Sequence, residues 1–99
     1  MSVSAANKAF VIKGLQSFVA ICSEPAPLKA VAEKLVKSLN SGLKMLESQN
    51  QPKAVEKIAQ WRTAASRIAL AGPDESAQEM LTALRKDILS YLEWWQKQA

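Results

Sequence analysis

The sequence contains no histidine, and this absence bears first on chemistry. Histidine is the commonest general base near neutral pH, the usual partner of a nucleophilic serine or cysteine, and the commonest metal ligand. There is one cysteine, Cys22, so no pair of thiolates can hold zinc or close an internal disulfide. An unpaired cysteine is typical of a reducing compartment, and we therefore expect a cytoplasmic protein.

Glycine and proline are also scarce, with three and four residues among 99. Glycines only at positions 14, 42 and 72 cannot build a Gly-rich phosphate loop or a dinucleotide-binding fingerprint. They also leave little material for the many tight turns of a β-sandwich or β-barrel. Long apolar runs are missing too, since Lys13 and Gln16 interrupt the first of them. We therefore expect no segment that crosses a bilayer and no membrane partner.

The ionisable residues that remain do not form a catalytic pair. Cys22 falls on an apolar stripe, where a thiol is more often an inert core residue than a reactive thiolate. Several carboxylates fall on the outer faces of predicted helices, as solvated partners of nearby lysines: Glu33, Glu47, Glu56 and Glu93. We expect no catalytic residue, no metal site and no cofactor, and hence a protein that is not an enzyme.

What the sequence does have is a helical period of apolar residues, which make up 48% of the chain. In four segments they recur at alternating steps of three and four, which places them on one helix face. The segments are residues 4–22, 27–49, 52–71 and 76–97. The first two stripes are Val11, Leu15, Phe18 and Cys22, then Leu28, Ala32, Leu35, Leu39, Gly42 and Leu46. The last two are Ala54, Ile58, Trp61, Ala65 and Ile68, then Ala77, Leu81, Leu84, Ile88, Tyr91 and Trp95.

Short connections separate these segments. Pro25 and Pro27 interrupt the helical pattern after residue 22, because proline lacks a backbone donor and restricts the residue before it. Residues 50–52 and 72–73 predict two further reversals. Short connections favour antiparallel neighbours, so we predict one all-α domain, residues 1–99, folded as an antiparallel up-down-up-down four-helix bundle. The alternative is two helical hairpins, joined by the Pro-rich loop, that dimerise to complete a core.

Positive charge is concentrated on the two central segments. The chain has a net charge of +4, whereas residues 28–71 hold eight basic against three acidic residues, a net charge of +5. We predict that six of these basic side chains contact a nucleic-acid backbone or another polyanion: Lys34, Lys37, Lys44, Lys53, Lys57 and Arg67. Such contact would ignore base sequence, because the patch lacks the aromatic residues of a base-stacking surface. The alternative is a solvated face that keeps a small bundle soluble.

Two apolar residues fall off the stripe of the last segment. Trp94 lies about 100° from the stripe, and Leu89 lies on its other flank. Tryptophan is enriched at binding hot spots, so we predict that Trp94 and Leu89 contact a partner protein. The alternative for Trp94 is that its ring folds over the open end of the bundle.

These features together predict a non-catalytic helical interaction module, a small subunit of a larger assembly. It would bind other protein subunits through apolar surface and a nucleic-acid backbone through its basic segments, with a second copy of the chain as another partner. In size, basic charge and all-helical build it resembles the small subunits of RNA-guided CRISPR effector complexes, a likeness of architecture that involves no sequence motif. The alternative is a protein-only adaptor, inhibitor or immunity-type bundle whose lysines meet an acidic protein.

Overall fold

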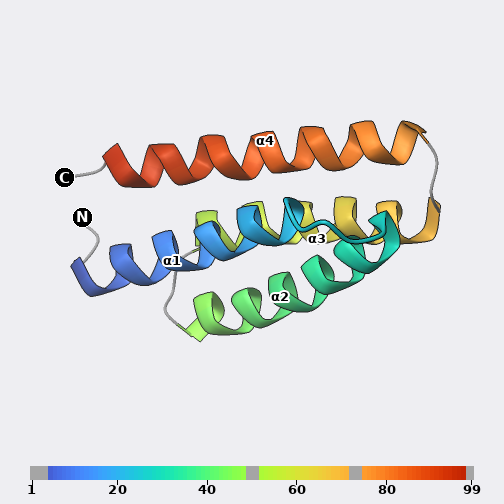
Figure 1. The fold of residues 1–99 in the computed structure, drawn as a ribbon. Coiled ribbons are helices and arrows are strands. Elements are labelled where there is room, and N and C mark those ends of the chain that lie inside the picture. Colours follow the sequence, from blue (N-terminus) through green and yellow to red (C-terminus); the bar gives the residue numbers. More distant parts are fainter. Residues whose placement is uncertain (1–4, 49–51, 72–74, 98–99) are drawn as a thin grey trace.

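The computed structural model describes residues 5–48, 52–71 and 75–97, which form four α-helices (Figure 1). These are α1 (Ala5–Cys22), α2 (Leu28–Ser48), α3 (Pro52–Ala71) and α4 (Glu75–Lys97). The predicted helix ends differ from these bounds by one residue at most. The reversals predicted at residues 50–52 and 72–73 lie outside the described residues, except for Pro52, which begins α3.

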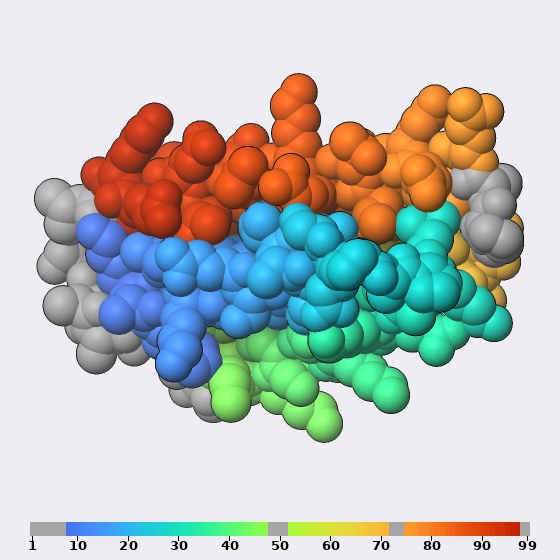
Figure 2. Space-filling view, in the orientation of Figure 1, coloured from blue at the N-terminus to red at the C-terminus, as the bar shows by residue number. Residues whose placement is uncertain are grey.

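Successive helices run in opposite directions, so α1 begins and α4 ends at the same end of the bundle (Figure 1). The most extensive packing joins α2 to α3, and the next joins α1 to α4. In the space-filling view, side chains of α1 and α4 meet along the face that is turned toward the viewer (Figure 2). The contacts of α1 with α4 and of α2 with α3 join the first two helices to the last two, so the four helices form one bundle rather than two separate hairpins. The predicted all-α four-helix bundle is therefore confirmed.

One apolar core runs through the bundle and takes residues from all four helices. Every residue of the stripes predicted for α1 and α3 is buried. Among the described residues, none of the buried ones is of a charged or polar type. The largest fully buried side chains are Trp61, Leu15, Leu35, Leu39, Ile68 and Ile88. Since burying one large apolar side chain contributes about 1.5–3 kcal/mol, this core is the main source of stability.

The buried face of α4 differs from its predicted stripe. Leu81 and Tyr91 are only half-buried, whereas Leu92, which lies outside the predicted stripe, is buried. The reason is that α4 packs more extensively on α1 than on α3, so that its buried face is turned toward α1. In α2, Leu28 and Gly42 are likewise half-buried. Leu28 is the first residue of its helix, and Gly42 lines a groove described below.

The loop between α1 and α2 is fixed by hydrogen bonds at both of its ends. The Ser23 backbone N–H donates to the Ala20 carbonyl at 3.1 Å, a tightened last turn for α1. The Val31 N–H donates to the Pro27 carbonyl at 3.0 Å, which starts α2 directly after the proline. The Arg85 side chain of α4 donates to the Ser23 hydroxyl at 2.9 Å and ties the loop to the bundle.

The facing of α2 can be tested with two neighbouring positions. Leu39→Ala removes a fully buried side chain and should lower the free energy of unfolding by about 2–5 kcal/mol. Lys37→Ala changes an exposed side chain of the same helix and should alter it by less than about 0.5 kcal/mol. Urea denaturation measures both values. Equal losses in the two variants would contradict the assigned core face.

Candidate functional site

An exposed aromatic surface lies near the C-terminal end of α4. Trp94 is 52% exposed, whereas Trp61 and Trp95 are 2% and 3% exposed, so the tryptophan that departs from its stripe is the accessible one. The Trp94 ring stacks on Tyr91 with an interplanar angle of 1° and centroids 5.9 Å apart. It also meets Trp95 in an edge-on arrangement at 5.7 Å. These neighbours hold the exposed indole in a defined orientation.

An ion pair and a hydrogen bond join α3 to α4 beside this aromatic surface. Trp61 Nε1 donates to Asp87 Oδ2 at 2.7 Å. Lys57 Nζ lies 4.0 Å from Asp87 Oδ1 and 5.9 Å from the centroid of the Tyr91 ring. Asp87 therefore accepts a hydrogen bond from a buried indole and also forms an ion pair with Lys57. An unpaired buried indole N–H would be unfavourable, which gives Asp87 a structural role as well.

Sequence reasoning missed Asp87. The available signal was Trp61, which falls in the middle of an apolar stripe and, as a buried indole, needs a hydrogen-bond acceptor. Several polar residues of α4 offered such an acceptor, and only the packing of α3 on α4 selects Asp87. With Lys57, Ser90, Tyr91 and Trp94, Asp87 lines a shallow hollow of about 300 Å³.

The six basic residues predicted to contact a polyanion do not share one environment. Lys34 Nζ donates to Glu24 Oε1 at 2.6 Å, and Lys57 is engaged with Asp87 and Tyr91. The other four are exposed and, within the described ranges, make no ion pair or hydrogen bond. We call these four, which lie on α2 and α3, the basic surface: Lys37, Lys44, Lys53 and Arg67. Contact of any of the six with a polyanion stays a prediction.

The two residues predicted to contact a partner protein lie apart. Leu89 is half-buried and packs against the core, whereas Trp94 projects from it. They are five positions apart in the sequence, which corresponds to about 140° around a helix. Their side chains therefore do not form one surface. Other large apolar residues are exposed on the remaining helices: Phe10 on α1, Met45 on α2 and Leu70 on α3.

Cys22 is buried at the end of α1. Burial raises the pKa of its thiol from 9.0 to about 11, although the positive charge of Arg85 acts in the opposite direction. The thiol is therefore protonated at neutral pH, and the thiolate is the reactive form. Over residues 5–48, 52–71 and 75–97, histidine, cysteine, aspartate and glutamate side chains form no group of three that could hold a metal ion.

Comparison with known proteins finds no relative of this chain: no protein-family model, curated protein or solved structure matches it. In the described part of the chain, no helix combines the length and the hydropathy that a membrane span requires.

The protonation of Cys22 leads to a reactivity prediction. At pH 8 the folded chain should react with a thiol reagent at least about 100-fold more slowly than the urea-unfolded chain, because the pKa is raised by about two units. The folded-state rate should rise as the pH approaches 11. The reagent is an aromatic disulfide, and the absorbance of the aromatic thiolate that it releases follows the reaction of both the folded and the unfolded chain. Equal rates in the folded and unfolded states would show that the thiol is accessible and ionised.

Proposed function

We propose that this protein is a non-catalytic helical interaction module, a subunit of a larger assembly, and that it binds another protein through the aromatic surface of α4. The observation that carries this proposal is Trp94, a half-exposed indole stacked flat on Tyr91. A large side chain that is already held in one orientation loses little conformational entropy on binding. Tryptophan and tyrosine are also the residues that most often supply the central contacts of protein interfaces.

The surroundings of Trp94 support the same proposal. Lys57, Asp87 and Ser90 lie around the two aromatic rings and line the same hollow. An aromatic centre with a polar, charged rim is the usual composition of a protein interface. A partner with complementary charges would be oriented by the Lys57 and Asp87 side chains, which carry opposite signs.

The docking proposal is tested with Trp94→Ala and with Leu70→Ala as a matched control. Leu70 lies on α3 and is 88% exposed, so it offers an exposed apolar side chain outside the aromatic surface. Each tagged chain is purified from its native host. A partner protein should accompany the original chain and Leu70→Ala at equal yield, and Trp94→Ala should lose it while its helical circular dichroism is unchanged. If all three chains retain the same partners, the aromatic surface is not the docking site.

A second candidate function, contact with a nucleic-acid backbone, is supported by the basic surface. Its four side chains are exposed on α2 and α3, and no described carboxylate neutralises them. If each neutralises one phosphate, the logarithm of affinity should fall with the logarithm of salt concentration with a slope of about −3.6. Base sequence should have little influence, since backbone contacts carry no sequence information.

Contact with a nucleic-acid backbone is tested by reversing the charge of two lysines on α2, with two lysines on α4 as the control. Lys37→Glu combined with Lys44→Glu should weaken binding to a mixed-sequence duplex and make the salt slope shallower by about 2. The control is Lys86→Glu combined with Lys97→Glu, two exposed lysines of α4. Fluorescence anisotropy across a salt series measures both pairs. If no duplex binds at low salt, or if both pairs act alike, the basic surface is a solvated face and an acidic protein becomes the better partner.

A further inference from the structure

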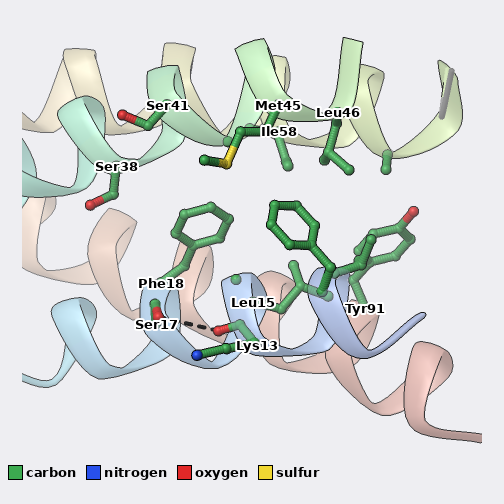
Figure 3. A pocket seen from close by; sticks show the side chains of 15 residues that line it. Lys13, Leu15, Ser17, Phe18, Ser38, Ser41, Met45, Leu46, Ile58 and Tyr91 are labelled. Carbon is green, nitrogen blue, oxygen red and sulfur yellow. Dashed lines mark hydrogen bonds between the residues drawn. The ribbon is translucent and has the colours of Figure 1, made fainter. Parts of the chain in front are cut away.

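The seam between α1 and α2 opens into an apolar groove of about 440 Å³ (Figure 3). This volume lies within the range of about 300–1,000 Å³ that is usual for small-molecule sites. Each of the four helices contributes to its walls: Phe10 and Phe18 from α1, Met45 from α2, Ile58 from α3 and Tyr91 from α4. The groove exists because α1 and α2 diverge from their connecting loop and pack less extensively than α2 and α3 (Figure 1).

Two helical glycines give the groove its shape. A Cβ atom at Gly14 of α1 would meet nothing within 4 Å, so this position faces open space in the groove wall. A Cβ atom at Gly42 of α2 would lie 3.1 Å from Cζ of Phe18, so the phenylalanine ring occupies the place of a side chain there. Glycine weakens a helix relative to alanine. At Gly14, however, the small residue keeps apolar space accessible. At Gly42 it lets the Phe18 ring lie against the helix.

The serine hydroxyls of α2 lie toward one end of the groove. These are Ser38 and Ser41, whereas Leu46 and Tyr91 lie toward the other end (Figure 3). At the rim, Ser17 Oγ donates to the backbone carbonyl of Lys13 at 3.2 Å. This order follows from the antiparallel hairpin, which brings the later part of α1 beside the earlier part of α2.

The charge at the groove is of one sign. Within the described part of the chain, Lys13 is the charged residue that lines the groove, and no carboxylate does. The side chain of Lys13 is exposed at the rim, outside the apolar floor. Its flexible stem allows the ammonium group to reach an anion at the mouth of the groove. A ligand with an apolar body and an anionic head therefore complements both parts of the site.

A helix from a partner does not fit between α1 and α2, because the Phe18 ring of α1 already reaches Gly42 of α2. The groove passes between α1 and α2 and reaches Ile58 of α3 and Tyr91 of α4. A helix is about 10–12 Å wide with its side chains and would have to force α1 away from α2. A single alkyl chain needs no such movement. Along α1 the lining runs from Phe10 to Phe18, about 12 Å at the helical rise per residue, which matches an extended decanoate chain.

We propose that this groove binds a free alkyl carboxylate, with the chain among the aromatic and aliphatic side chains and the carboxylate at the Lys13 rim. The site is separate from the protein-docking surface around Trp94, although Tyr91 lines both. Binding removes the chain from water and covers Phe10 and Met45, which are exposed in the free protein.

Decanoate is the probe for this proposal, and Gly14→Leu is the decisive variant. The leucine side chain enters open space, so the variant should melt at a higher temperature than the original chain and bind decanoate at least tenfold more weakly. Gly14→Ala is the matched control, because it removes the same glycine but adds only a methyl group. It should also melt higher while it retains binding. Titration calorimetry and thermal melts give both readouts, and a loss of binding with raised stability cannot come from unfolding.

The head group is tested by comparing decanoate with decanol. Lys13→Gln should weaken decanoate binding by about two- to fivefold, as expected for an exposed ion pair, and leave decanol binding unchanged. Lys44→Gln, an exposed lysine of α2 that does not line the groove, should change neither. Gly14→Leu should leave the capture of a partner protein through Trp94 intact, because Gly14 does not line the hollow beside Trp94, and this separates the two proposals. The proposal is overturned if decanoate does not bind, if Gly14→Leu binds it as well as Gly14→Ala does, or if Lys13→Gln affects both probes equally.

Discussion

The antiparallel packing of α2 against α3 is the contact on which the rest of the structure depends. It is the most extensive helix pair, and its interior holds fully buried residues such as Leu35, Leu39 and Trp61. α4 packs on α3 beside this pair, and α1 is held mainly by α4. Because α1 packs more extensively on α4 than on α2, its seam with α2 is left partly open. The apolar groove is thus a direct consequence of unequal packing in the bundle.

The same packing decides which charges and rings reach the surface. Trp61 is buried between the helices, and its indole N–H finds an acceptor in Asp87 of α4. Asp87 also pairs with Lys57, which places that lysine beside Tyr91 and withdraws it from the basic surface. Tyr91 in turn supports Trp94 by stacking. One buried tryptophan therefore leads, through four contacts, to the exposed aromatic surface that we propose as a docking site.

Helix positions were predictable from the sequence because each stripe has a regular period, and the stripe of α3 is buried in full. Features that depend on a particular neighbour were not predictable. Leu92 replaces Tyr91 in the core because α4 leans toward α1. The partners of Lys34 and Lys57 come from another helix or a loop, so their pairing could not be read from a helical wheel. The groove was missed because a glycine such as Gly14 carries no sign of the space beside it.

The central claim is that α1 and α2 part from each other at Gly14 while they remain in contact through Phe18 and Gly42. Nuclear Overhauser spectroscopy of the free chain in solution tests this most directly. The account predicts strong cross-peaks between the Phe18 ring protons and the Gly42 α-protons, because a Cβ atom at Gly42 would lie 3.1 Å from the ring. It predicts that any cross-peak from the Gly14 α-protons to side chains of α2 is weak, because no heavy atom of α2 lies within 4 Å of a Cβ atom placed at Gly14. Cross-peaks between Gly14 and α2 as strong as those between Phe18 and Gly42 would mean that the seam is closed, and would contradict the account.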